Sequence, residues 1–119
     1  MNPPLGVGED NDHYYKGEIV ILVNEVTQSQ AEYTTMALRV APGAKVLGST
    51  TAGADGNVSQ IVLPGGIGTL ISGIGVYYPD GKETQRTGII PDVELRPTIK
   101  GIINNQDELL NKAIELIIK

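Results

Sequence analysis

The segment from Asn24 to Glu32 contains residue types and a spacing that suit acyl-transfer chemistry. It ends in Ser29-Gln30-Ala31-Glu32, directly before a region with helical periodicity. A hydroxyl at a helix N-terminus lies among unpaired backbone N–H groups and at the positive end of the helix dipole. There, Ser29 could act as a nucleophile, and the backbone N–H of Gln30 could donate to a tetrahedral oxyanion. Ser29 and Glu32 also fit the capping-box pattern, and the pattern by itself favours that structural interpretation.

A serine nucleophile needs a base to take its proton, and the sequence offers no evident one. His13 is the single histidine, and its neighbours are mostly Asp, Asn and Tyr, which predicts a solvated loop. No lysine lies between Lys45 and Lys82. The chain has no cysteine, which excludes thiolate catalysis, disulfides and cysteine-based zinc sites, and we expect no metal or cofactor. The sequence therefore lacks an evident base for Ser29, and His13 is the single candidate within it.

The elements around Ser29 form a predicted β-α-β unit. Glu18 to Asn24 is a continuous apolar and β-branched run, which indicates a strand buried on both faces of a parallel sheet. Apolar residues from Ala31 to Val40 follow at helical spacing and stop at Pro42-Gly43. Lys45 to Gly48 predicts a second short strand, which completes the unit and places Ser29 at the first strand-to-helix turn.

The second half of the chain has a different pattern. Ser49 to Asn57 is a loop of small residues. Short strands separated by glycine-rich turns are expected at Val58–Leu63, Thr69–Ser72 and Gly75–Tyr78. Pro79-Asp80-Gly81-Lys82 is a strong turn signal that predicts an antiparallel hairpin. Residues 87–93 are expected to be extended, and a final helix with an apolar stripe is expected from about Gln106 to Ile118.

Length and composition predict one folded domain, and the order of its elements predicts the α/β class, with a mostly parallel buried sheet, flanking helices and an antiparallel hairpin region. The chain has 119 residues, of which 40% are hydrophobic and 19% charged, which excludes intrinsic disorder. Residues 1–16 read as an irregular lead-in, without the pattern of a signal peptide, and residues 17–119 as the domain. The net charge is −5 and the nine basic residues are scattered, so we expect no nucleic-acid partner.

Three blocks of the sequence resemble those of the C-terminal processing (tail-specific) serine peptidases. The first, Ile21 to Glu25 followed by Gln28 to Glu32, resembles the segment that carries the family's nucleophile. Val46 to Gly53 is similar to a Val-x-Gly-x-x-Thr-x-Gly block, and Gly88-Ile89-Ile90-Pro91-Asp92 matches a Gly-Ile-x-Pro-Asp element. The blocks follow the family's order, and the resemblance spans about residues 17–118. It implies a ClpP/crotonase-like fold and hydrolysis of peptide bonds.

The resemblance assigns roles to individual residues. It implies that Ser29 is the nucleophile and that the backbone N–H of Gln30 donates to the oxyanion. The base lysine of many members would stand at Ala54, so this chain looks like the tricorn-like branch, in which a histidine from far upstream is the base. The supporting glutamate of that branch would stand at Gln85, while Glu83 is nearby but out of register.

The resemblance also implies what surrounds this chain. We expect it to be the C-terminal, nucleophile-bearing part of a longer serine peptidase, inactive alone because the base lies upstream. Its partners would be a peptide or protein substrate, the upstream domains of the same protein and, for the isolated fragment, further copies of itself. The family implies a location in the cell envelope, the periplasm or outside the cell. The alternative is a catalytically inactive peptide-binding or structural module, which the uncharged Ala54 and Gln85 favour.

Overall fold

The computed structural model describes residues 13–118, so most of the expected lead-in at residues 1–16 lies outside the described residues. The domain division itself stays a prediction. In chain order the elements are β1 (Val20–Val23), α1 (Gln30–Leu38), β2 (Lys45–Gly48), β3 (Asn57–Leu63), β4 (Ile67–Ile74), β5 (Val93–Glu94), α2 (Ile99–Ile103) and α3 (Glu108–Ile117). This mixture of a parallel sheet, helices and a hairpin confirms the predicted α/β class.

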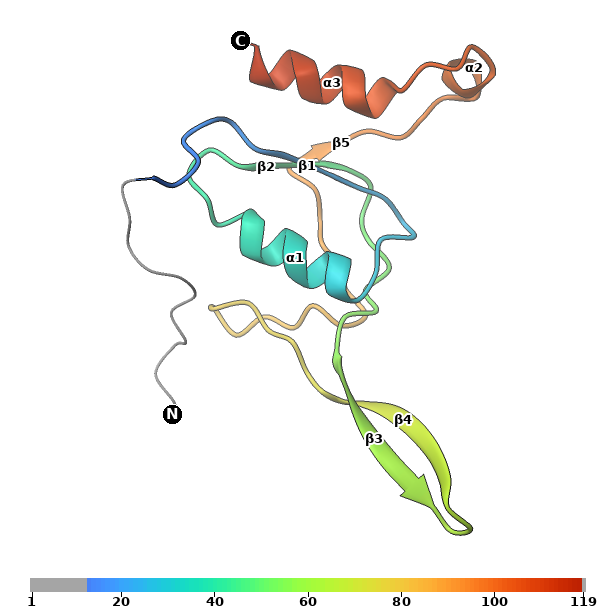
Figure 1. The fold of residues 1–119 in the computed structure, drawn as a ribbon. Helices are drawn as coiled ribbons and strands as arrows, with labels where there is room; N and C mark the ends of the chain where they lie inside the picture. The colour runs from blue at the N-terminus through green and yellow to red at the C-terminus, as the bar shows by residue number, and fades with distance from the viewer. Residues whose placement is uncertain (1–12, 119) are drawn as a thin grey trace.

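The β-α-β unit forms as the sequence predicts, but β1 is not buried on both faces, because Leu22 is 42% exposed. The strands β1 and β2 are parallel, with Ile21 opposite Val46, and β5 pairs in parallel with the other edge of β2. Figure 1 shows α1 and α3 on opposite sides of this sheet, and α3 packs against β1 and β2. Gly48 has a φ of 141°, and a Cβ there would lie 1.8 Å from the carbonyl oxygen of Val23, so only glycine permits this close approach of β2 to β1.

The core follows from the alternation of side chains along these strands. On the α1 face, Val23 and Val46 pack with Met36 and with Ile89 from the later extended segment. Leu47 is fully buried and points to the opposite face, where α3 contributes the buried Ala113. Aliphatic side chains therefore fill both sides of the sheet, as the aromatic-poor composition requires.

The antiparallel ladder lies elsewhere than expected. The strands β3 and β4 pair from Leu63–Ile67 at the turn to Asn57–Ile74 at the root, and the turn contains Gly65 and Gly66 at positive φ. The expected strand Gly75–Tyr78 is wrong, because that segment makes only an isolated bridge between Tyr77 and Glu83. The predicted turn at residues 79–82 does form, closed by hydrogen bonds between Tyr78 and Lys82 and between Gly81 and Tyr78. The consecutive glycines provide the hairpin turn instead.

The C-terminal part has one helix more than the sequence pattern indicates. The predicted final helix corresponds to α3, which begins after Asp107, whose side chain accepts from the N–H of Leu110 at 2.9 Å. The additional helix α2 is a five-residue helix capped by Thr98, whose hydroxyl accepts from the N–H of Gly101. Glu108 accepts from the hydroxyl of Thr98 at 3.0 Å and so joins the two helices. A helix of five residues is too short to show a hydrophobic periodicity, so the sequence pattern did not predict α2.

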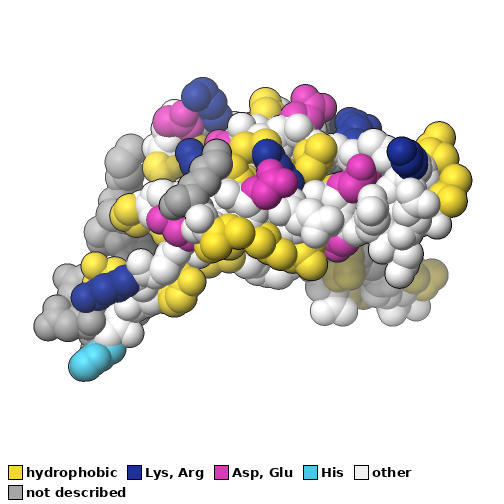
Figure 2. Space-filling view, turned by 90° about the horizontal axis from the view of Figure 1, so that it is seen from above, with side chains coloured by type: hydrophobic (Ala, Val, Ile, Leu, Met, Phe, Trp, Pro, Cys, Tyr) yellow, Lys and Arg dark blue, Asp and Glu magenta, His cyan; other side chains and the backbone are white. Residues whose placement is uncertain are grey.

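Much aliphatic surface is left exposed on two parts of the structure. The hairpin β3–β4 projects from the sheet (Figure 1), and its exposed aliphatic residues are Val58, Ile61, Val62, Leu63, Ile67, Leu70, Ile71 and Ile74. Figure 2 views the molecule from the α2–α3 side and shows apolar side chains between charged ones; on α2, Ile99 and Ile103 are more than 75% exposed. None of the described helices is long and apolar enough to cross a bilayer.

Candidate active site

Ser29 lies at the turn between β1 and α1, as predicted, and its backbone is strained. The turn is built by Asn24, whose side-chain oxygen accepts from the N–H groups of Val26 and Thr27 at 3.2 and 3.1 Å. Ser29 follows as the N-cap residue of α1, with φ 53° and ψ −124°. L-residues rarely adopt such a conformation, and it persists where the surrounding structure holds it. A serine on a strained strand-to-helix turn is also how nucleophile elbows expose their hydroxyl.

The Ser29 side chain is presented to a pocket rather than covered. Ser29 is exposed and lines a pocket of about 510 Å³ together with Gln30. Within residues 13–118 no acceptor contacts the backbone N–H of Gln30. The remaining lining residues are Tyr33, Asp55, Gly56, Asn57, Val58, Ile74 and Val76. An exposed serine and a backbone N–H without a described acceptor therefore lie at one partly apolar pocket.

Glu32 connects Ser29 to the next loop. Its side chain is fully buried, and its Oε2 accepts from the N–H of Ser29 at 3.1 Å and from the N–H of Ala54 at 3.0 Å. Its Oε1 accepts from the N–H of Gly53 at 2.8 Å and from the hydroxyl of Thr51. The capping-box interpretation of Ser29 and Glu32 is thus correct, and Ser29 lines the pocket as well.

Asp55 is a second buried carboxyl at the pocket. It is 5% exposed, its Oδ1 accepts from the N–H of Gly56 at 2.9 Å, and its Oδ2 has no hydrogen-bond partner among the described residues. Burial raises the pKa of the Asp55 carboxyl; the Gly56 N–H opposes this shift, and the nearby charge of Glu32 adds to it. Nothing in the sequence pattern distinguished Asp55 from an ordinary turn residue.

The other residues singled out in the sequence fall into different places. Gln85 is partly buried, and its Nε2 lies 2.5 Å from the position a Cβ on Gly56 would take, so its amide is at the edge of the Ser29 pocket. Ala54 contributes its N–H to Glu32. His13 is exposed, and no described residue lining the pocket is a histidine, lysine or arginine. The described part of the chain therefore offers Ser29 no basic residue.

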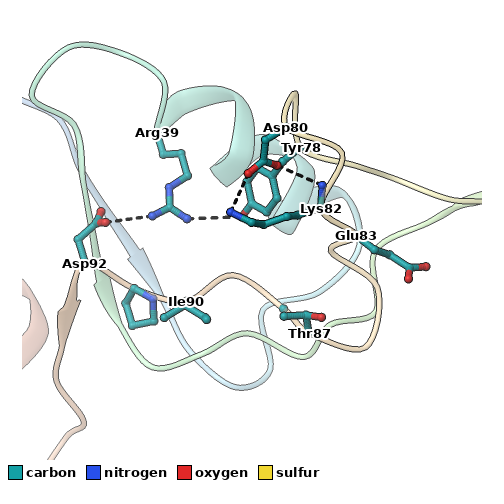
Figure 3. Close-up of a pocket in the computed structure, with 10 residues that line it drawn as sticks. Arg39, Tyr78, Asp80, Lys82, Glu83, Thr87, Ile90 and Asp92 are labelled. Carbon is teal, nitrogen blue, oxygen red and sulfur yellow. Dashed lines mark hydrogen bonds and ion pairs between the residues drawn. The ribbon is translucent and has the colours of Figure 1, made fainter.

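A second pocket, of about 420 Å³, lies beside the last block (Figure 3). Arg39 reaches from the end of α1 to Asp92, with its Nη2 3.0 Å from Oδ1, and its Nη1 donates to the hydroxyl of Tyr78 at 3.4 Å. Lys82 pairs with Asp80 at 2.7 Å. Both cations are paired with carboxylates of the same chain, so we assign these pocket residues a structural role.

The fold and the presented serine define the class, a ClpP-like α/β protein with a strand-to-helix serine turn. The chain belongs to peptidase family S41, whose family model matches residues 6–95. This confirms the resemblance to the C-terminal processing serine peptidases. No curated protein sequence gave a significant match.

Solved structures support the same assignment. A protein described as a peptidase from Parabacteroides merdae is 25% identical, with a TM-score of 0.77 over 88% of this chain and 33% of that chain. Mature CPAF is 25% identical, with a TM-score of 0.68 over 84% of this chain and 20% of that chain. The photosystem II D1 C-terminal processing protease is 29% identical, with a TM-score of 0.55 over 66% of this chain and 20% of that chain. The chain thus spans a third or less of these relatives.

Proposed function

We propose that this chain is the nucleophile-bearing part of a serine peptidase that hydrolyses peptide bonds of protein substrates. The observation that carries the proposal is the backbone of Ser29, held at φ 53° and ψ −124° with its side chain exposed to a pocket. A capping serine needs no such strain, whereas a nucleophile elbow does. Membership of peptidase family S41 supports the same role.

The proposed reaction is acyl transfer through Ser29. A base takes the proton of the hydroxyl while Oγ bonds to the scissile carbonyl carbon, and the carbonyl oxygen becomes an oxyanion. The free N–H of Gln30 donates to this oxyanion. The protonated base then gives its proton to the leaving amine, and water hydrolyses the acyl-enzyme. We propose that the base is a histidine from upstream of this chain, since no described pocket residue is basic.

We propose that the substrate binds as an extended peptide beside the hairpin root. Val58 and Ile74, near the base of the hairpin, line the pocket with Ser29, and among the described strands both hairpin strands have an unpaired edge. Such an edge can add a peptide as a further strand. Location in the cell envelope or outside the cell is proposed from the family alone. In the same way, Gln85 is proposed to support the base by hydrogen bonding, without the charge of a glutamate.

A catalytically inactive peptide-binding or structural module is the second candidate. Two observations favour it: the family's base position is Ala54, whose N–H is used by Glu32, and the position of the supporting glutamate is the uncharged Gln85. This candidate keeps the fold and the pocket and predicts peptide binding without turnover.

Active-site labelling of the full-length protein that contains this chain separates the two candidates. A fluorophosphonate probe should label the folded wild type and leave Ser29→Ala unlabelled, while Ser72→Ala, an exposed serine on β4, should label like the wild type. Lactacystin is a second probe, because mature CPAF has been solved in complex with it. A folded full-length wild type that reacts with neither probe would establish the inactive module. Turnover by the isolated 119-residue chain would contradict an upstream base and implicate His13.

A further inference from the structure

We infer that Glu32 is a positioning residue for the nucleophile: its buried carboxylate holds the Ser29 backbone in its strained conformation and fixes the residue 51–54 loop against it. The inference rests on the proposed function, which supplies the reaction that this positioning serves. Its core, however, is a set of hydrogen bonds that can be tested without turnover.

The environment of the Glu32 carboxylate excludes a role as proton acceptor for Ser29. The side chain is fully buried, and no ion pair between described residues includes it. Four donors contact its two oxygens: three backbone N–H groups and the hydroxyl of Thr51. A carboxylate has about four lone-pair sites, so its acceptor capacity is full. Glu32 can therefore organise the site, but it has no free lone pair for a reacting proton.

The hydrogen bond from Ser29 determines which N–H group remains available for the oxyanion. Because Glu32 accepts from the N–H of Ser29, that group points into the protein, and the next N–H, of Gln30, is left without an acceptor in the described chain. Without the Glu32 carboxylate, the Ser29 backbone would lose the hydrogen bond that holds it at positive φ and could relax to an unstrained conformation. Presentation of the hydroxyl and freedom of the Gln30 N–H therefore have the same cause.

The same carboxylate joins all three sequence blocks. Glu32 lies in the first block, and Thr51, Gly53 and the adjoining Ala54 come from the second. The hydroxyl of Thr51 in turn accepts from the N–H of Ile89 in the third block at 2.7 Å. The loop continues directly into Asp55, which lines the pocket. One buried carboxylate thus sets the position of the nucleophile relative to the pocket wall.

Three variants of the full-length protein separate positioning from general stability. Glu32→Ala removes every acceptor. Glu32→Gln keeps one acceptor oxygen and replaces the other with an NH₂ group. The hydroxyl of Thr51 can accept from this NH₂ group, whereas a backbone N–H cannot. We therefore expect the remaining oxygen to accept from the N–H groups of Ser29 and Ala54. Thr51→Val is the matched control: it breaks the bonds of the hydroxyl to Glu32 and from Ile89 but leaves the Ser29 bond intact.

The first measurement is the maximal rate of fluorophosphonate labelling per folded molecule. Displacing a reacting group by about 1 Å typically lowers the reaction rate about 100-fold. We therefore expect the labelling rate of Glu32→Ala to fall by a factor of that order. Glu32→Gln should recover most of that loss, and Thr51→Val should label like the wild type although it is less stable. Equal labelling of folded Glu32→Ala and wild type would overturn the inference, as would a loss in Thr51→Val as large as that in Glu32→Ala.

The second measurement does not need activity. Amide hydrogen exchange at Ser29 and Ala54, followed by NMR with selective ¹⁵N labelling, should be slow in the wild type, Glu32→Gln and Thr51→Val and fast in Glu32→Ala. If the wild type fails to label, the proposed function fails, and this exchange pattern still decides whether Glu32 holds the Ser29 backbone. Fast exchange at Ser29 in the wild type would refute the inference by itself.

Discussion

Arg39 and Asp92 form an ion pair of 3.0 Å that connects the end of α1 to the Gly-Ile-x-Pro-Asp block (Figure 3). The other oxygen of Asp92 accepts from the N–H of Val46, a fully buried residue of β2, at 2.8 Å. Asp92 therefore joins a helix and a strand of the β-α-β unit, and its place in the motif has a structural explanation. Neither of these partners of Asp92 is a described residue of the Ser29 pocket.

Substitutions at Asp92 should lower stability in two steps. In Asp92→Ala the buried N–H of Val46 loses its acceptor, which typically costs about 1–3 kcal/mol. Asp92→Asn keeps an acceptor and loses only the partly exposed ion pair, so we expect a loss of about 1 kcal/mol or less. Urea unfolding measures both, with Arg39→Met as a control that should match Asp92→Asn. Equal losses in the alanine and asparagine variants would argue against the Val46 hydrogen bond as the dominant contribution.

The strain at Ser29 predicts an unusual order of stability for two variants of this residue. Glycine adopts φ 53° and ψ −124° without steric cost, whereas alanine carries the same strain as serine. We therefore expect Ser29→Gly to be more stable than Ser29→Ala by about 1 kcal/mol, even after the greater entropy of glycine in the unfolded chain is counted. Thermal unfolding of both variants measures the difference. A more stable alanine variant would show that the Ser29 backbone is not strained.

Asp55 should make stability fall as pH rises. Because burial raises the pKa of this carboxyl in the folded state above its unfolded value, its contribution is fully present below the unfolded pKa and is lost as pH rises through the folded pKa. Asp55→Asn removes this dependence on pH. It also buries an NH₂ group without an acceptor, which lowers the free energy of unfolding by about 1–3 kcal/mol at every pH. The stability of Asp55→Asn relative to wild type should therefore increase with pH. A difference that is constant with pH would contradict this.

Asp80→Asn serves as the control of opposite sign. Hydrogen bonding to Lys82 lowers the pKa of Asp80, so its contribution is present above the unfolded pKa and is lost as pH falls through the folded pKa. The stability of Asp80→Asn relative to wild type should therefore decrease with rising pH. Urea unfolding between about pH 3 and pH 8 compares both variants with wild type.

The exposed hairpin should make the isolated chain self-associate. A two-stranded hairpin is marginally stable in water by itself, and no charged residue occurs from Gly56 to Pro79, so nothing in β3 or β4 opposes apolar contact. We expect the double variant Val62→Lys, Leu70→Lys to reduce the mass measured by light scattering. Thr69→Lys, Ser72→Lys adds the same charge without removing aliphatic surface and should have a smaller effect. A wild-type chain that stays monomeric at high concentration would refute the prediction.

The sequence pattern predicted individual helices and strands more accurately than it predicted which strands pair with each other. The β-α-β unit, the start of α1 after Ser29 and the helix α3 depend on periodicity and caps within a few residues, and all three are confirmed. The hairpin was expected around Pro79 to Lys82, but its ladder formed around Gly65 and Gly66. Both turn sequences permit a hairpin, and the choice between them depends on how far regular pairing extends along the flanking strands, which is not a local property.

The amino-acid order alone determined the α/β class and put a serine where a buried strand meets a helix, because hydrophobic periodicity and capping chemistry act over short stretches of chain. Only the tertiary structure decided that Ser29 would be strained, exposed and open to a pocket, and that Glu32 and Asp55 would be buried beside it. These features require segments more than twenty residues apart to pack together, as Glu32 does with Ala54. Long-range packing brings a buried carboxylate its hydrogen-bond donors, and no spacing of residues along the chain encodes that meeting.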